Sequence, residues 1–208
     1  MSKVAQRYGR AAFGDSVARL NQLPPDDGRE VAFAGRSNAG KSSALNAITG
    51  RTSLARTSKT PGRTQLINLF ELGGDRRLVD LPGYGFARAP EATRRRWEGL
   101  IGDYLAARSS LTGIMLMLDI RRGVTDLDWR LIAMATPAGI PLHALLTKSD
   151  KLKRGQAMRT LEAVRQELEN EGVEATLQLF SALRGVGIDD AHGILDEWLQ
   201  LGDDTRAE

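Results

Sequence analysis

Eight consecutive residues near the start of the chain match the phosphate-binding pattern G-x-x-x-x-G-K-[ST]. The two glycines let the backbone curl so that successive N–H groups point at one phosphate group, while Lys41 supplies a positive charge for the outer phosphates. The hydroxyl of Ser42 is a suitable ligand for Mg²⁺. The pattern therefore predicts a nucleotide site whose phosphate loop comprises Gly35, Arg36, Ser37, Asn38, Ala39, Gly40, Lys41, Ser42 and the adjacent Ser43.

The surroundings of this loop favour the same interpretation. Residues 30–34, which are apolar after Glu30, predict a strand that leads into the loop, and residues 41–48 predict a helix that follows it. The N-terminus of such a helix favours an anion. A chance Gly-rich turn between a strand and a helix gives the same pattern, so the other loops are needed to distinguish a nucleotide site from such a turn.

A second candidate loop follows the strand expected at residues 77–81. Asp80 can hold a magnesium-bound water, and Gly83 can bring its backbone N–H close to a terminal phosphate because it has no Cβ. Asp-x-x-Gly alone mostly marks turns. Placed after a strand in a chain with a phosphate loop, it predicts nucleotide contacts from Asp80, Leu81, Pro82 and Gly83.

Two later loops offer groups that suit guanine. Asp150 can accept hydrogen bonds from the ring N1–H and the exocyclic amine together, a donor pair that adenine lacks. The aliphatic stem of Lys148 can cover the plane of the base. The predicted base contacts are Thr147, Lys148, Ser149 and Asp150, with Phe180, Ser181 and Ala182 meeting the guanine carbonyl through backbone N–H groups.

With these motifs in place, the chain resembles the EngB/YihA family of bacterial GTP-binding proteins, which are Ras-like P-loop GTPases of the TRAFAC class. The resemblance runs from about Phe13 to Leu199, and its most specific features are Thr147, where related GTPases have asparagine, and the segment 60–64, Thr-Pro-Gly-Arg-Thr. It implies a Ras-like G domain that cycles between GTP and GDP with Mg²⁺. It also implies a role in assembling the large ribosomal subunit or its precursor, and a need for the protein in normal cell division and septation.

The resemblance further assigns the metal and switch residues. Thr64 corresponds to the threonine whose hydroxyl completes the magnesium shell when the γ-phosphate is present. Ser42, Thr64 and, through a water, Asp80 would hold the metal. The neighbours of the switch threonine, expected around the nucleotide, are Gly62, Arg63, Gln65 and Leu66.

Catalysis is expected to be slow without a partner. Lys41, Thr64 and Gly83 are the predicted catalytic residues, but Tyr84 occupies the position where many GTPases have the water-orienting glutamine. Asn38 could help to bind K⁺ near the transferred phosphate, or it could make only a hydrogen bond that stabilises the loop. Both alternatives remain open.

Alternating strand-like and helix-like stretches predict an α/β fold with a mainly parallel sheet and helices on both faces. The Gly73-Gly74-Asp75 turn is short enough for a hairpin, so six strands with one antiparallel edge strand are expected. We expect an N-terminal extension (1–29) with a short helix at 11–20, a G domain (30–201) and a flexible tail (202–208). The expected strands are 30–34, 66–71, 77–81, 113–119, 141–147 and 175–180, and the expected helices are 41–49, 91–107, 125–137, 156–171 and 187–200.

The composition excludes some kinds of chemistry and bears on location. The 208 residues include no cysteine, which excludes disulfides and thiol chemistry, and only two histidines, for which a packing role is expected. The longest apolar run, at residues 113–118, is far shorter than the ~20 residues that cross a bilayer. A cytoplasmic monomer without membrane insertion is expected.

The formal charge is +3, and the basic residues fall into three groups that could face RNA or only solvent. The groups are Arg51, Arg56, Lys59 and Arg63; Arg94, Arg95 and Arg96; and Lys148, Lys151, Lys153 and Arg154.

Two other functions share the phosphate loop. A P-loop phosphotransferase, such as a nucleotide or metabolite kinase, would leave Asp150 and Ser181 without a role. A signalling GTPase that acts directly on division proteins would use the same nucleotide site, so the sequence does not separate it from a ribosome assembly factor.

Overall fold

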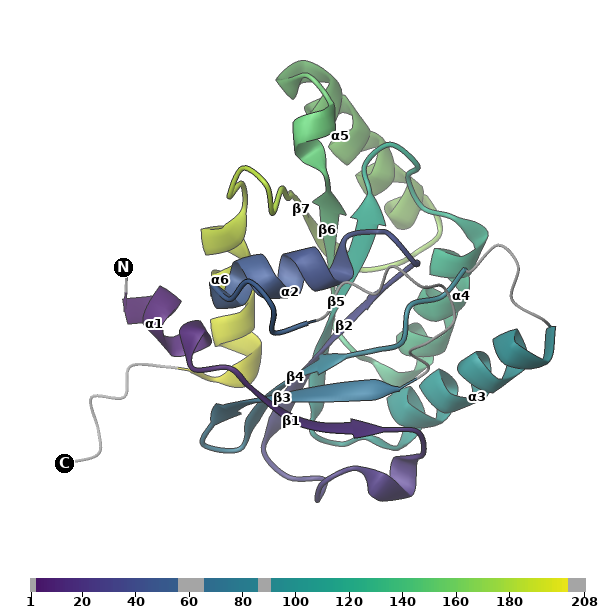
Figure 1. Cartoon of the computed structure of the whole chain (residues 1–208). Coiled ribbons are helices and arrows are strands. Elements are labelled where there is room, and N and C mark those ends of the chain that lie inside the picture. The colour runs from purple at the N-terminus through teal and green to yellow at the C-terminus, as the bar shows by residue number, and fades with distance from the viewer. Residues whose placement is uncertain (1–2, 56–65, 86–90, 202–208) are drawn as a thin grey trace.

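The computed structural model describes residues 3–55, 66–85 and 91–201, which form a seven-stranded sheet with helices on both faces (Figure 1). The strands are β1 (Ala12–Val17), β2 (Arg29–Gly35), β3 (Ile67–Gly73), β4 (Arg76–Asp80), β5 (Leu111–Asp119), β6 (Leu142–Thr147) and β7 (Ala175–Leu179). The helices are α1 (Lys3–Gly9), α2 (Lys41–Thr49), α3 (Glu91–Ala107), α4 (Asp126–Ala135), α5 (Arg154–Asn170) and α6 (Ile188–Leu199), with short 3₁₀ turns at Leu20–Gln22, Thr136–Ala138 and Ser149–Lys151.

The order of strands across the sheet is β1-β3-β4-β2-β5-β6-β7, and the five strands from β4 to β7 are parallel. Strands β5 and β6 are almost continuously apolar because side chains on both of their faces are buried. Helices α1, α2 and α6 cover one face of the sheet, and α3, α4 and α5 cover the other (Figure 1). The predicted fold class is therefore confirmed.

Two expectations about the first part of the chain are wrong. The helix expected at residues 11–20 is strand β1, which pairs antiparallel with β3 and makes the strand count seven instead of six. The hairpin between β3 and β4 is confirmed, but β3, the antiparallel strand, lies second from the edge, with β1 outside it. Most of β1 is exposed, so its sequence lacks the alternation that identifies a half-buried strand.

Helix α1 was not expected from the sequence, and it packs against α2 and α6. Tyr8 is fully buried, stacks on His192 with 4.5 Å between ring centroids, and donates a hydrogen bond of 2.7 Å to Asp196. His143 lies between Thr176 and Gln178, and burial lowers its pKa. Both histidines have the packing role that the sequence predicted. None of the helices in the described part of the chain is long and apolar enough to span a bilayer.

A buried charged cluster fixes the amino end of β2. Glu30 is fully buried and accepts hydrogen bonds from Arg108 at 2.6 and 3.0 Å and from the Tyr104 hydroxyl at 3.0 Å. Arg77 lies 3.5 Å from the same carboxylate and 3.2 Å from Glu71. A carboxylate with several charged donors can remain ionised in the core, but each cation then depends on it.

Replacing Glu30 by glutamine removes the buried counter-charge of the Arg108 guanidinium and leaves only the more exposed Asp26, at 3.5 Å. We expect Glu30→Gln to lower the free energy of unfolding by about 3–5 kcal/mol, measured by urea denaturation without nucleotide. Glu71→Gln is the matched control because Glu71 also pairs with Arg77 but is 42% exposed, and it should cost about 1 kcal/mol or less. Equal losses in the two variants would contradict a special role for the buried carboxylate.

Candidate nucleotide site

Four loops meet at the carboxyl edge of the sheet, where ligands bind in open α/β folds. They follow β2, β4, β6 and β7, which are neighbours or near neighbours in the sheet order (Figure 1). These are the loops that carry the phosphate, Asp-x-x-Gly and base motifs of the sequence. The fold therefore brings three separate motif groups to one place.

The phosphate loop has the backbone conformation that its glycines suggest. Asn38 has φ +64° and Gly40 has φ +99°, a left-handed conformation at the point where α2 begins with Lys41. The N–H of Ser37 donates to the carbonyl of Tyr84 at 2.6 Å, so the loop is bonded to the segment after β4. Ser42 and Ser43 lie in the first turn of α2, where free N–H groups can meet a phosphate group.

Lys41 and Asp80 form an ion pair across the phosphate side of the site, and each side chain is 11% exposed. Asp80 also accepts a hydrogen bond of 3.3 Å from the amide of Asn68 on β3. The charge that would meet the outer phosphates and the carboxylate that would hold a metal-bound water are therefore adjacent. The Ser42 hydroxyl and the Asp80 carboxylate are oxygen donors of the hard kind that Mg²⁺ prefers, so this donor set fits that ion.

The base side of the site is built around Asp150. Its carboxylate accepts a hydrogen bond of 2.5 Å from the Ser181 hydroxyl and lies 3.6 Å from Lys151 Nζ. The N–H of Ser149 donates to the carbonyl of Phe180 at 3.1 Å, which joins the two base loops. The Ser181 hydroxyl is the main cause of a lowered pKa for Asp150, so the carboxylate stays ionised as an acceptor.

Thr147 joins the base side to the phosphate side. Its hydroxyl bonds to the carbonyls of Ala39, in the phosphate loop, at 2.5 Å and of Leu118, on β5, at 3.1 Å. The side chain also lies beside Gly40, where an added Cβ would be 3.5 Å away. Thr147 is thus a buried link between the loops, with 3% of the residue exposed.

Tyr84 points into the core, away from the surface of the site. It is 4% exposed, donates a hydrogen bond of 2.7 Å to Asp128, and has its ring centroid 5.0 Å from that of Trp97. Trp97 in turn donates to the carbonyl of Pro82 at 2.8 Å. Burial raises the pKa of Tyr84 well above its usual value, and Asp128 raises it further. The Tyr84 hydroxyl is therefore hydrogen-bonded to Asp128 on α4.

The other residues predicted for the site differ in burial and in how close they lie to the phosphate loop. Leu81 and Phe180 are 1% exposed and belong to the core, so only their backbone groups can face a ligand. Gly83 lies close to the phosphate loop, since an added Cβ would be 3.6 Å from Ser37. Leu66 is half-buried just before β3. Four predicted residues, Gly62, Arg63, Thr64 and Gln65, lie outside the described residues, as do Arg56 and Lys59.

Two residues near the site were missed by the sequence reasoning. Asn68 contacts Asp80, as described above. Asn46 on α2 exchanges hydrogen bonds of 2.8 and 3.0 Å with the backbone N–H and carbonyl of Ala55, the last described residue before position 66. A polar residue on a helix that follows a phosphate loop is the only signal that could have drawn attention to Asn46.

A phosphate loop between β2 and α2, an Asp-x-x-Gly loop after β4 and a carboxylate loop after β6 define a P-loop GTPase. Residues 30–148 match a family model described as 50S ribosome-binding GTPase. The chain is 52% identical over 195 residues to the probable GTP-binding protein EngB of Nitrosococcus oceani, covering 94% of this chain and 98% of that protein. It is 53% identical over 193 residues to the same protein of Azoarcus sp. (strain BH72), covering 92% of each. The chain belongs to the EngB family of GTP-binding proteins.

Solved structures agree with this assignment at the level of the fold. A probable GTP-binding protein engB superposes with a TM-score of 0.66 at 23% identity, covering 83% of this chain and 99% of that one. Era in complex with MgGDPNP and nucleotides 1506–1542 of 16S ribosomal RNA gives 0.61 at 20% identity, covering 82% and 56%. Family membership makes this chain a GTP-hydrolysing enzyme and decides against the phosphotransferase alternative.

Removing the Ser181 hydroxyl should change the pH dependence of GDP binding. The hydrogen bond lowers the pKa of Asp150, so Ser181→Ala raises that pKa and the carboxylate becomes protonated at a higher pH. Because the sequence predicts that the ionised form accepts from guanine, GDP affinity in the variant should begin to fall at a higher pH on acidification. Lys151→Gln is the control and should shift the titration less, because Lys151 is a smaller cause. Identical pH profiles for Ser181→Ala and the wild type would contradict this account.

Proposed function

We propose that this GTPase is a nucleotide-dependent switch in the assembly of the large ribosomal subunit, and that normal cell division and septation depend on that activity. The observation that carries the proposal is the match of residues 30–148 to a family described as 50S ribosome-binding GTPase. The likeness to Era, whose structure includes a segment of 16S ribosomal RNA, supports RNA as a partner for this fold. A monomer in the cytoplasm fits this role.

The predicted site residues support the following nucleotide chemistry. Lys41 and the phosphate-loop N–H groups bind the phosphates, Asp150 selects guanine, and the backbone N–H of Gly83 meets the γ-phosphate. Ser42, Thr64 and a water on Asp80 would hold Mg²⁺, which would supply charge neutralisation at the phosphates. The resemblance assigns Thr64 a metal contact that depends on the γ-phosphate, so Thr64 would make the switch sensitive to the bound nucleotide.

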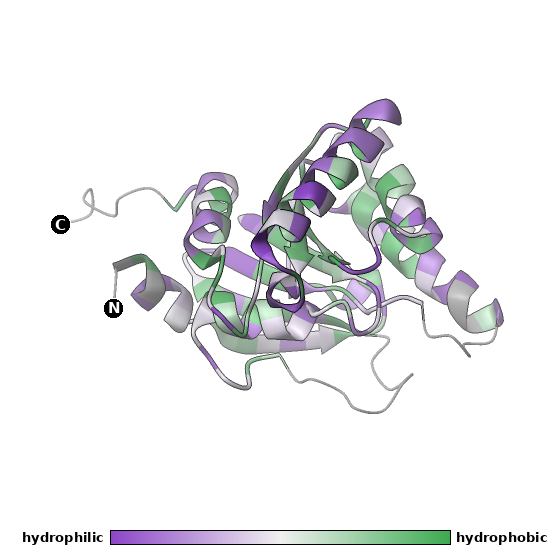
Figure 2. Ribbon diagram, turned by 90° about the horizontal axis from the view of Figure 1, so that it is seen from above, coloured by the Kyte–Doolittle hydropathy of each residue, from purple (hydrophilic) through white to green (hydrophobic). Residues whose placement is uncertain are grey.

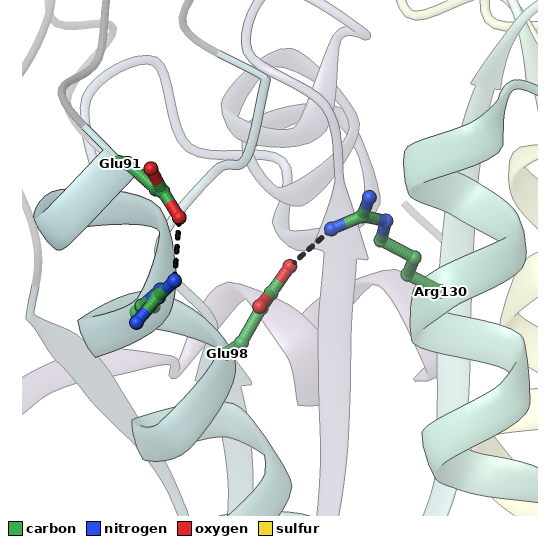
Figure 3. A pocket seen from close by; sticks show the side chains of 4 residues that line it. Glu91, Glu98 and Arg130 are labelled. Atoms are coloured by element: carbon green, nitrogen blue, oxygen red, sulfur yellow. Dashed lines mark hydrogen bonds and ion pairs between the residues drawn. The ribbon is translucent and has the colours of Figure 1, made fainter.

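The basic groups differ in how well they suit RNA. On α3, Arg95 pairs with Glu91 at 2.6 Å, and the nearby Glu98 pairs with Arg130 of α4 at 2.7 Å (Figure 3). Glu91 and Glu98 therefore offset the positive charge of the two arginines in the pocket that these four side chains line. Lys153 and Arg154, at the start of α5, are exposed and have no ion-pair partner within the described residues. We therefore favour the start of α5 for contacts with RNA phosphates.

Co-sedimentation with purified ribosomal subunits tests the proposed partner. We expect binding to the large subunit, not the small one, to be stronger with a non-hydrolysable GTP analogue than with GDP, and to weaken steeply with salt. Lys153→Gln/Arg154→Gln should weaken binding and reduce the salt dependence. The matched control, Arg10→Gln/Arg19→Gln, makes the same charge change at exposed arginines away from α5 and should have little effect. Absence of binding in both nucleotide states would contradict the proposal and favour protein partners in cell division.

Hydrolysis without a partner should be slow because Tyr84 cannot orient the attacking water. We expect single-turnover rates far below the order of 10 per second that is typical of enzymes. Tyr84→Phe should leave the rate unchanged, since the lost hydroxyl bonds to Asp128 in the core. A fast rate of hydrolysis without a partner, or a large loss of rate in Tyr84→Phe, would contradict this assignment.

The same assay tests K⁺ binding by Asn38. Equal rates of hydrolysis in Na⁺ and K⁺ would exclude a role for K⁺ and leave Asn38 with the loop-stabilising role.

A further inference from the structure

Asp119 is a buried carboxylate at the carboxyl end of β5 that none of the roles above uses. Its side chain is 6% exposed and lies between two cations. Arg121 donates to it from Nε at 2.9 Å and from Nη2 at 2.7 Å, and Lys148 Nζ donates to its Oδ2 at 2.9 Å. The backbone N–H of Arg121 adds a contact of 3.1 Å.

The Lys148 ammonium group has a second partner on the other side of the site. It donates a hydrogen bond to the carbonyl of Asn38 in the phosphate loop. The backbone of Lys148 has φ +59°, a left-handed conformation that few non-glycine residues adopt, and this turns the chain between Thr147 and Asp150. One ammonium group therefore touches the end of β5 and the phosphate loop, from a loop that also carries the guanine acceptor.

We propose that Asp119 is a positioning residue that holds Lys148 across the site, so that the base loop and the phosphate loop have their binding arrangement before the nucleotide arrives. The inference rests on the proposed role of Lys148 at the base. A lysine has a long flexible stem, and its orientation must be restricted by partners if it is to cover a ring plane. Restricting it in the free protein reduces the cost of ordering it on binding.

A role for Asp119 in its own loop alone accounts for only part of these contacts. The contacts with Arg121 close the turn after β5, and the N–H of Arg122 donates to the carbonyl of Asp119 at 2.8 Å. Those interactions need neither Lys148 nor the phosphate loop. Arg121 is 49% exposed, whereas Lys148 is 30% exposed and also bonds to the phosphate loop. The carboxylate thus serves two partners, and they can be separated by mutation.

The charged state of Asp119 suits this role. The hydrogen bond from Arg121 and, after it, the contact with Lys148 hold the pKa of the carboxyl well below its usual range despite burial. The carboxylate therefore remains ionised at any pH at which the protein would be assayed. Substitution by asparagine keeps the size of the side chain and removes the charge.

The test is a double-mutant cycle on the affinity for fluorescently labelled GDP, with ADP as competitor and thermal unfolding measured without nucleotide. Asp119→Asn should weaken GDP binding about 10-fold, as Lys148→Met should, while the double variant should be no more than about 2-fold weaker than Lys148→Met alone. Arg121→Gln, which removes the other partner of the same carboxylate, should change GDP affinity by less than about 2-fold. The preference for GDP over ADP should persist in all four variants.

Three outcomes would overturn the inference. Additive losses in the double variant would show that Asp119 does not act through Lys148. Equal losses in Arg121→Gln and Asp119→Asn would show a role confined to the loop. If Asp119→Asn binds GDP with wild-type affinity while Lys148→Met binds it more weakly, only the role of Asp119 is overturned. If Lys148→Met binds GDP with wild-type affinity, the proposed role of Lys148 at the base is overturned as well. If Asp119→Asn does not fold, Asp119→Glu keeps the charge but displaces the carboxylate, and the same outcomes apply.

Discussion

The burial of the central parallel strands on both faces is the constraint from which the site follows. Strands β2, β5 and β6 bury almost all of their residues, and they are stable because helices cover both sides of the sheet. Seen from above in Figure 2, hydrophobic residues concentrate in the sheet and on the inward sides of the helices, and hydrophilic residues on the outer sides. Since these strands run in one direction, their carboxyl ends lie at one edge, and every polar loop that follows them is brought to the same place.

Hydrogen bonds between the loops then make one site from several segments. The phosphate loop is bonded to the segment after β4 through Ser37 and Tyr84, and to the base loop through Thr147 and Lys148. The opposite end of β2 is fixed independently by the buried Glu30 cluster. Two separate sets of contacts thus hold the two ends of the strand that carries the phosphate loop.

Much of the fold and the site could be predicted from the sequence because the relevant signals are local. The phosphate loop, the hairpin at Gly73-Gly74-Asp75 and the long buried strands each carry their own pattern. Strand β1 could not be predicted, because an exposed edge strand shows no alternation and is defined by pairing with β3. Helix α1 depends on docking against α2 and α6. The contact between Asp119 and Lys148 joins the end of β5 to the loop after β6, and no local pattern in the sequence shows it.

The central claim is that the loops at the carboxyl edge form a guanine-nucleotide site whose base preference depends on Asp150. The most direct test is calorimetric titration of Asp150→Asn with GDP, ADP and xanthosine diphosphate, with Asp126→Asn as an exposed control. The account predicts that Asp150→Asn loses GDP binding and gains binding of xanthosine diphosphate, whose ring carbonyl accepts from the new amide, while the control binds GDP as the wild type does. Retained preference for GDP in Asp150→Asn would contradict the account.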